Sequence, residues 1–236
     1  MKKLLFIYAG ILFATGLVSS CAKDNYDAPS STFNGRIVYN GEPINVEVGQ
    51  VNFELWQPGF GASGAIPVNV AQDGAFSSLL FNGNYKLVFT ANQGPFFWKR
   101  NTSGAVDTVA LDINGDKTMD IEVTPYYMIR NTKINVSGKT VTATCGLEKV
   151  ITDANAKNVE RISLYINKTQ FVSANGTQNI AKADINGGAI DNINDITLST
   201  SIPDIVPTQN YIFARIGLKI AGVEDMIFSP LQKLTF

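Results

Sequence analysis

The residues best suited to chemistry in this chain are three consecutive aromatic residues, Phe96, Phe97 and Trp98, in the run Gly94 to Asn101. Aromatic faces can stack on the C–H surfaces of a sugar, while amide and acidic side chains take its hydroxyl groups. In an extended segment neighbouring side chains point to opposite sides, so the three rings cannot all enter one core. We therefore predict that at least one is exposed or covered by another loop, and all three are candidate ligand-binding residues. The alternative is that the rings fill the edge of a domain or pack on a second domain.

Trp56 is the second candidate for ligand binding. Period-two alternation over residues 51–56 places Trp56 on the same strand face as Asn52 and Glu54, just before a turn-rich segment at residues 57–61. An indole beside amide and acidic groups suits a sugar. The alternative is lateral packing of Trp56 against a neighbouring loop.

The chain contains no histidine, which removes several kinds of catalysis. Ser-His-Asp and Cys-His nucleophile systems are excluded, as are zinc sites built on imidazole. Paired carboxylates, as in glycoside hydrolysis, remain open, but no Asp or Glu pair stands out in the sequence. We expect a protein that is not an enzyme and that has no cofactor.

An acidic segment from Asp112 to Asp120 places oxygen-bearing side chains at alternate positions, as calcium loops do. An EF-type loop needs glycine at its sixth position and glutamate at its twelfth, where this segment has Lys117 and Val123. We predict a tight hairpin at the Asn114–Gly115 pair and no metal site.

The two cysteines of the chain have different predicted roles. Cys21 follows, in order, two lysines, an apolar run and three small residues, at positions 2–3, 4–17 and 18–20. The apolar run is shorter than the roughly 20 residues of a membrane span. The whole segment resembles a bacterial lipoprotein signal, in which Cys21 is acylated and becomes the new N-terminus. Cys145 then has no disulfide partner, and its alternation with Val141 and Ala143 predicts a buried position.

The elements that position these residues are nearly all β-strands. Apolar residues alternate with polar ones in four segments, around residues 51–56, 66–70, 85–90 and 119–124. Gly-containing turn pairs separate such segments: Asn40-Gly41, Asp73-Gly74, Asn82-Gly83 and Asn114-Gly115. Short strands at this spacing predict sandwiches or barrels.

Composition limits the partners. The formal net charge is −1, which argues against a basic nucleic-acid surface, so we expect no nucleic-acid partner. There is no polybasic cluster for anionic lipid, so membrane attachment depends on the lipid at Cys21. A mature chain of about 215 residues can form one large β domain or two smaller ones.

The first half resembles the carboxypeptidase regulatory-like (prealbumin-like) β-sandwich. The resemblance lies in a "D-G-x-F" motif, residues 73–76, a "G-x-Y-x-L" motif, residues 83–87, and in earlier segments at residues 33–37, 40–44 and 51–55. Such domains serve as adaptors and spacers as well as binders, so this resemblance implies fold rather than function.

The second half resembles an Ig-like, fibronectin type III sandwich. Residues 205–211 are similar to the segment that enters its strand F, where a proline precedes a tyrosine corner, and residues 228–234 resemble its last strand. In this chain, however, the clean apolar stripe runs from Ile212 to Ile220 and leaves Tyr211 on the opposite face. A bulge could restore the corner, or Tyr211 does not form one.

Together these features resemble an uncharacterised family of two-domain Bacteroidetes surface lipoproteins, associated with starch-utilisation-type (Sus-type) uptake systems. The resemblance implies a signal peptide at 1–20, a lipidated tether at 21–32, a prealbumin-like sandwich at 33–125 and an Ig-like sandwich at 126–236. The charged residues just after Cys21 resemble the export signal of such proteins, which implies display on the outer membrane. Asp107-Thr108-Val109 matches a short O-glycosylation pattern of the same bacteria, so Thr108 is a hypothetical sugar attachment site.

Two functional hypotheses follow. In the first, the protein is a non-catalytic accessory that binds a glycan or related nutrient through the aromatic residues above. In the second, it is a structural lipoprotein that docks on a Sus-type outer-membrane transporter or a partner lipoprotein and binds no small ligand. A groove lined by Trp98 or Trp56 favours the first hypothesis, and a flat exposed apolar patch favours the second.

Overall fold

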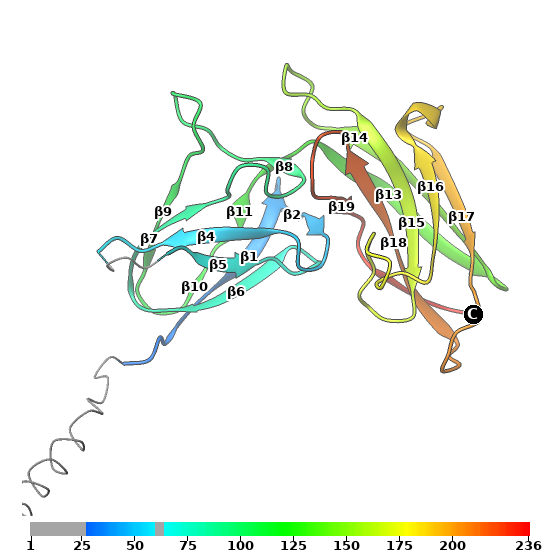
Figure 1. Cartoon of the computed structure of the whole chain (residues 1–236), viewed down its shortest axis with the longest axis horizontal. Coiled ribbons are helices and arrows are strands. Elements are labelled where there is room, and N and C mark those ends of the chain that lie inside the picture. Colours follow the sequence, from blue (N-terminus) through cyan, green and yellow to red (C-terminus); the bar gives the residue numbers. More distant parts are fainter. Residues whose placement is uncertain (1–26, 60–63) are drawn as a thin grey trace, which may run out of the picture.

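The computed structural model describes residues 27–59 and 64–236, so the predicted signal peptide and Cys21 lie outside the described residues. The chain forms two β-sandwiches that lie end to end (Figure 1), and the predicted all-β fold class is confirmed. The helix found in the described part is one short 3₁₀ turn, η1 (Gly187–Ala189). Within the same residues, no helix is long and apolar enough to cross a membrane.

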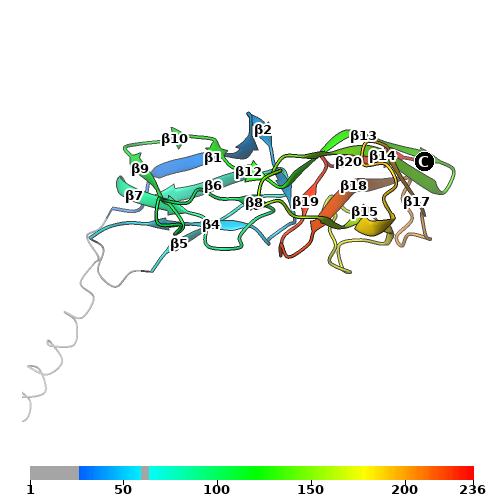
Figure 2. The same ribbon diagram turned by 90° about the horizontal axis from the view of Figure 1, so that it is seen from above.

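The N-terminal sandwich consists of two packed sheets, whose layers are separated in Figure 2. In the first sheet, β1 (Ser31–Tyr39) pairs with four short strands: β2 (Glu42–Pro43), β6 (Ala75–Leu80), β10 (Lys117–Thr118) and β11 (Ile121–Glu122). The second sheet has the order β5 (Ile66–Asn69), β4 (Asn52–Trp56), β7 (Gly83–Val88) and β9 (Val109–Ile113). A two-stranded ribbon of β8 (Phe96–Phe97) and β12 (Thr124–Pro125) leads toward the second sandwich.

The C-terminal sandwich also has two sheets. The smaller one has the order β13 (Tyr127–Ser137), β14 (Thr140–Lys149) and β17 (Ile196–Ser201). The larger one has the order β16 (Ala181–Asn186), β15 (Val159–Asn167), β18 (Tyr211–Ile220), β19 (Ile227–Phe228) and β3 (Asn45–Val46), with β20 (Gln232–Thr235) also paired to β18.

A chain of aromatic rings fills the N-terminal core. Phe33 and Phe53 each lie about 5 Å from Phe76, with centroid distances of 5.1 and 5.0 Å, and Phe53 lies 5.5 Å from Phe89. Edge-to-face and tilted ring pairs of this kind add about 0.5–1.5 kcal/mol each to the burial of the rings. Phe89 is the last member of this core before the aromatic run at residues 96–98, so the core extends to the edge of the domain.

The apolar stripe on β18 is buried as its period-two pattern predicts, from Ile212 to Ile220. Tyr211 lies on the opposite face, where its ring contacts Phe213 and the ammonium group of Lys233 lies 4.2 Å from its centroid. Cys145 is also buried as predicted, and burial raises the pKa of its thiol to about 12. A thiol in that state is not a reactive nucleophile at neutral pH.

The turn residues Asn40–Gly41 and Asn114–Gly115 both lie between strands, but only the first pair forms a hairpin. Asn40 and Gly41 have positive φ values and join β1 to β2 as a two-residue hairpin. The prediction of a hairpin at Asn114–Gly115 is wrong, because β9 pairs with β7 while β10 pairs with β1 in the other sheet. The turn therefore crosses between the two layers of the sandwich, and Asn82 holds it by accepting the N–H of Gly115 at 2.9 Å.

The two sandwiches share a sheet. β3 comes from the N-terminal half of the chain but pairs antiparallel with β19, so that Val46 lies opposite Ile227. Beside this pair, the buried guanidinium group of Arg215 donates to the carbonyl groups of Val46 and Val172 at 3.0 and 2.5 Å. The domains are thus joined by backbone pairing as well as by the chain itself.

Candidate functional site

The predicted aromatic run lies at the junction of the two sandwiches, where it lines a hollow that we call the junction pocket. Figure 1 shows the hairpin between β8 and β9 and the loop between β14 and β15 rising on either side of β8. The hollow has a volume of about 80 Å³ and is lined by residues 89–94 and 96–98, Arg100, Val106, Tyr126, Lys157, Gly222 and Val223. Both domains therefore contribute to it, which is a common location for ligand sites.

The three predicted aromatic residues have different surroundings in the pocket. Phe96 and Trp98 are 5% and 8% exposed, and each ring lies 5.0 Å from Phe89. Trp98 also donates its indole N–H to the carbonyl oxygen of Asp107 at 2.8 Å, so its polar edge is satisfied inside the protein. Phe97 is half-buried, as the alternation along β8 requires, and it offers the most open ring of the three.

Two turn residues hold the loop that forms one wall of the pocket. Gly94 has φ +80°, and a Cβ there would lie 2.2 Å from a ring atom of Phe96, so no larger residue fits. The N–H of Gly94 donates to a carboxylate oxygen of Asp225 at 2.7 Å, across the domain junction. Burial raises the pKa of Asp225, although this hydrogen bond from Gly94 opposes the change.

Two cationic side chains stand over aromatic rings in the pocket. The guanidinium group of Arg100 lies 5.5 Å from the centre of the Phe97 ring and donates to the carbonyl oxygen of Gly104 at 2.9 Å. The ammonium group of Lys157 lies 5.7 Å from the centre of the Tyr126 ring. Cation–π contacts at these distances contribute about 0.5–1 kcal/mol at exposed sites, enough to favour one side-chain orientation.

Tyr126 lies between the two domains, as expected for a residue at their junction. Its N–H donates to the carbonyl oxygen of Pro95, and its own carbonyl oxygen accepts the N–H of Val150 at 3.0 Å. Burial raises the pKa of the Tyr126 phenol, and the charge of Arg100 partly opposes this. The predicted domain boundary at 125–126 implies a junction position for Tyr126, but the sequence gave no sign that Lys157 would join it.

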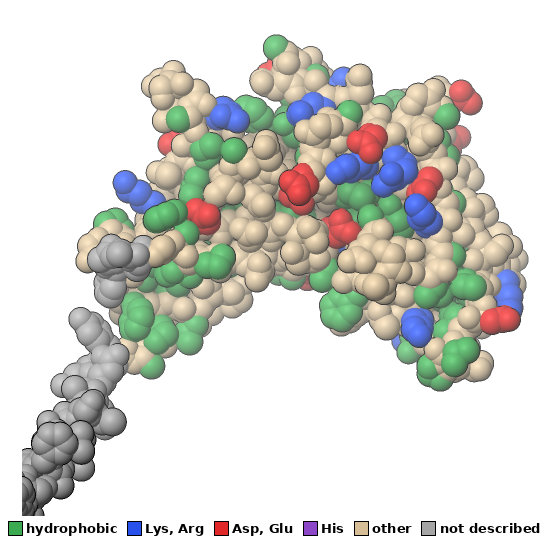
Figure 3. Space-filling model, viewed as in Figure 1, with side chains coloured by type: hydrophobic (Ala, Val, Ile, Leu, Met, Phe, Trp, Pro, Cys, Tyr) green, Lys and Arg blue, Asp and Glu red, His purple; other side chains and the backbone are tan. Residues whose placement is uncertain are grey.

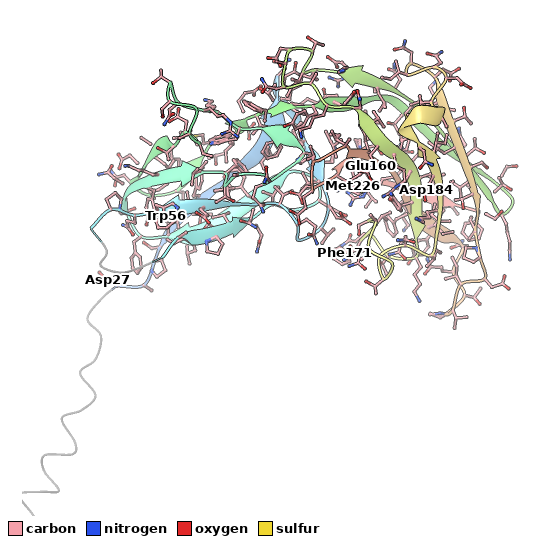
Figure 4. The ribbon with its side chains drawn as sticks, turned by 45° about the horizontal axis from the view of Figure 1, so that its top comes forward. Asp27, Trp56, Glu160, Phe171, Asp184 and Met226 are labelled. Atoms are coloured by element: carbon pink, nitrogen blue, oxygen red, sulfur yellow. The ribbon has the colours of Figure 1, made fainter. Side chains whose placement is uncertain are left out.

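Trp56 lies on a separate part of the N-terminal sandwich. It is 45% exposed, and its indole N–H donates to the Glu54 carboxylate at 2.9 Å, so the predicted face of the strand is correct. Lys86 lies directly opposite it on β7. Figure 4 shows Trp56 on the body of the N-terminal sandwich, so it cannot act with the junction pocket on one small ligand.

Phe171 is an exposed aromatic residue that the sequence did not indicate. It is 47% exposed and lies on the loop after β15, next to Gln170, whose carbonyl oxygen accepts a hydrogen bond from Gln72 of the N-terminal sandwich. Figure 4 shows Phe171 on the side of the C-terminal sandwich that faces the N-terminal one. No periodic pattern singles out this loop in the sequence.

The acidic segment at residues 112–120 is used inside the fold. Asp116 accepts the N–H of Thr32 at 2.7 Å, and Asp120 accepts the N–H of Arg36 and pairs with its guanidinium group at 3.2 Å. Lys117 donates to the carbonyl oxygen of Asp112. In the described residues, no cluster of three or more possible metal-ligating side chains occurs.

Family comparisons cover both sandwiches. The family described as "Protein of unknown function (DUF3823) N-terminal domain" matches residues 31–124, and "Domain of unknown function (DUF3823_C)" matches residues 127–233. No curated protein matches the chain.

Solved structures match nearly the whole chain. A DUF3823 family protein from Bacteroides ovatus is 32% identical with a TM-score of 0.75, covering 87% of this chain and 99% of its own. One from Parabacteroides merdae is 29% identical with a TM-score of 0.75, covering 89% and 100%. A Bacteroides uniformis protein described as "a putative carbohydrate binding protein" is 19% identical with a TM-score of 0.69, covering 89% and 100%, and shows the shared fold.

Proposed function

Since the chain belongs to the two-domain DUF3823 family, we propose that it is a non-catalytic, glycan-binding accessory lipoprotein of an outer-membrane nutrient uptake system. The open mouth of the junction pocket, around Phe97, is its binding site. Lipidation at Cys21 attaches it to the membrane, and a Sus-type transporter or lipoprotein is its partner.

The observation that carries the proposal is the composition of the junction pocket. The lining combines a half-buried ring, Phe97, with the amide residues Asn92 and Gln93 and with Arg100, and the Gln93 amide oxygen accepts the N–H of Asn52 at 3.2 Å. This combines an apolar face with planar hydrogen-bonding groups, which is what a sugar ring with hydroxyl groups requires. The description of the Bacteroides uniformis protein as a putative carbohydrate binding protein supports the same class of ligand.

The signal-like segment supports the cellular location. Residues 1–26, which contain it, lie outside the described residues, so location is tested in the cell. Labelling with a palmitate analogue is expected to modify the chain and to fail for Cys21→Ser. Protease treatment of intact cells is expected to remove the surface-displayed protein, and full protection would contradict surface display.

A binding screen tests the glycan proposal. The soluble chain of residues 22–236, which contains every described residue, is applied to a polysaccharide and oligosaccharide array. We expect binding that Phe97→Ala weakens by tenfold or more, about 1.4 kcal/mol, and that Trp56→Ala leaves unchanged. Loss of binding with Trp56→Ala alone would move the site to the surface around Trp56, and silence of the whole array would contradict glycan binding.

One observation favours docking as a second candidate function. Leu79 is 59% exposed and Phe81 is 39% exposed, and both lie beside Leu80, which pairs with Ser31 at the start of β1. Figure 3 shows hydrophobic side chains gathered at this end of the N-terminal sandwich, near the start of the described chain. Exposed apolar residues at the predicted tether end suit contact with a membrane-bound partner.

Crosslinking in native membranes tests the docking candidate. A specific partner is expected to crosslink to the wild-type chain and to be lost in the Leu79→Ser/Phe81→Ser variant. Substitution of the exposed Ile193, in the distant C-terminal sandwich, is the control. Equal crosslinking of both variants would exclude the patch.

A further inference from the structure

The charged groups that line the junction pocket all have the same sign. Arg100 and Lys157 are among its lining residues, and no Asp or Glu is among them. Asp225, which fixes the adjoining loop, is 5% exposed and directs its carboxylate to the N–H of Gly94. The pocket therefore presents positive charge to a ligand, although the whole chain carries a formal net charge of −1.

Both cations are held in place while keeping free donors. Arg100 makes one hydrogen bond to the carbonyl oxygen of Gly104, and Lys157 makes one to that of Gly222 at 3.2 Å. A guanidinium group has five N–H donors and an ammonium group has three, so most of them remain for a ligand.

The hydroxyl group of Tyr126 adds a third polar group. Lys157 lies over its ring, and Arg100 is close enough for its charge to lower the pKa of the phenol against the effect of burial. Among the described residues, this hydroxyl has no hydrogen-bond partner in the protein. Arg100, Lys157 and Tyr126 therefore line the same pocket as the Phe97 ring.

Another charged surface of the molecule differs in this respect. On the outer face of the larger C-terminal sheet, basic and acidic side chains lie side by side (Figure 3). There, Asp184 lies 2.8 Å from the ammonium group of Lys182 and 3.8 Å from the guanidinium group of Arg161. These cations are largely neutralised within the protein, whereas those of the junction pocket are not.

We propose that the junction pocket selects an acidic saccharide, whose carboxylate or sulfate group binds to Arg100 and Lys157 while its ring packs beside Phe97. This inference rests on the proposed glycan-binding function and names its ligand class. Charge-assisted hydrogen bonds to an anion are roughly twice as strong as neutral ones, so the acidic group contributes much of the affinity.

Three probes of matched length test the proposal on the chain of residues 22–236. They are an oligogalacturonate, which carries carboxylates, a sulfated galactan oligosaccharide, and a neutral maltooligosaccharide. We expect at least one acidic probe to bind tenfold or more tightly than the neutral one. Its affinity is expected to fall when salt is raised, because partly exposed charges are screened.

Charge-removing variants locate the interaction. Arg100→Gln and Lys157→Gln are each expected to weaken acidic binding about tenfold, which corresponds to about 1.4 kcal/mol. Lys99→Gln and Lys149→Gln remove exposed cations that do not line the pocket, and both are expected to leave the affinity for the acidic probe unchanged. Thermal unfolding of each variant shows whether the fold is retained.

The outcomes separate this inference from the proposed function. Equal or tighter binding of the neutral probe, unaffected by Arg100→Gln, would overturn acidic selectivity while supporting glycan binding. If Lys99→Gln weakened binding of the acidic probe as much as Arg100→Gln does, the binding would reflect net charge rather than the pocket. That result would also overturn the inference. Silence of all three probes and of the glycan array would contradict both proposals. A preference between the two acidic probes identifies the anion as carboxylate or sulfate.

Discussion

Phe97 and Trp98 are neighbours in the sequence, but their side chains have opposite surroundings. The Trp98 ring contacts Phe89 in the core and its N–H is bonded to Asp107. The Phe97 ring faces the junction pocket under Arg100. One residue therefore serves stability and the other is available to a ligand.

Substitution of each residue separates these roles. Trp98→Ala is expected to lower the free energy of unfolding by about 3–5 kcal/mol, because it leaves a cavity and an unpaired carbonyl group. Phe97→Ala is expected to cost only about 1–2 kcal/mol, since its ring is half-buried. Urea unfolding measures both, and equal losses would mean that Phe97 is also a core residue.

Asp225 gives the stability a pH dependence of predictable sign. Because its pKa in the folded protein is raised above the ordinary value of 3.8, the folded state retains a proton that the unfolded state has lost. The stabilisation from this group is full below 3.8 and is lost as the pH rises through the folded pKa. The buried side chain of Asp225 therefore favours folding more at acidic pH, where it is protonated, than at neutral pH.

The variant Asp225→Asn isolates this effect, since its amide stays neutral and can still accept the Gly94 N–H. The free energy of unfolding of the wild type, minus that of Asp225→Asn, is expected to increase from about pH 7 to about pH 4. Urea unfolding at several pH values measures the difference. A difference that is constant or that decreases on acidification would contradict a raised pKa.

At the scale of single residues, the sequence predicted part of the site. Alternation was sufficient to predict that Phe96, Phe97 and Trp98 do not all enter one core and that Trp56 lies with Glu54, but Phe96 and Trp98 fill the domain edge, as the alternative reading expected, and Phe97 is only half-buried. It could not predict that Lys157 meets Tyr126, because that contact depends on how two separate sandwiches pack. Nor could it choose which ring is open, since that depends on which face of β8 meets the core.

Among the elements, β3 is the least predictable from local pattern. It has two residues, and its pairing with β19 joins segments far apart in the chain. The longer strands show the expected alternation of apolar and polar residues. This alternation predicts which face of a strand is buried, but it does not predict which strand pairs with it. The turn at Asn114–Gly115 shows the same limit, because residue preference predicts a turn but not the sheets that it connects.

Arg215 stabilises the β3–β19 pair, and this role depends on the planar shape of its guanidinium group. Its planar group bonds two carbonyl oxygens and lies 3.8 Å from the centre of the Phe228 ring. Burial lowers its pKa to about 9, so it remains charged at neutral pH. Such a charge is tolerated in the interior because its hydrogen bonds and the aromatic face replace much of its hydration.

The variant Arg215→Lys tests this support. Lysine keeps the charge but cannot bond both carbonyl groups in the same plane, so we expect a loss of about 2–4 kcal/mol in the free energy of unfolding. Arg161→Lys, on the same sheet face in a partly exposed ion pair with Asp184, is the matched control and is expected to cost less than about 1 kcal/mol. Equal effects would show that Arg215 has no special role.

For the whole molecule, the shared sheet predicts that the two sandwiches unfold together. Residues 126–236 alone would lose β3 beside β19 and the Val46 acceptor of Arg215. We expect their unfolding midpoint to be about 5 °C or more below that of the complete chain, which should show one transition in calorimetry. Two separate transitions in the complete chain would show that the domains are independent.

The shared sheet also determines how the molecule responds to mechanical force. The chain crosses from one sandwich to the other at Pro125–Tyr126, and separate contacts join them at β3–β19, Gly94–Asp225 and Arg130–Glu42. A single connection would transmit tension and allow the second body to swivel. With several connections, a pull applied at Ser31 transmits torque as well as tension, so the C-terminal sandwich turns with the N-terminal one.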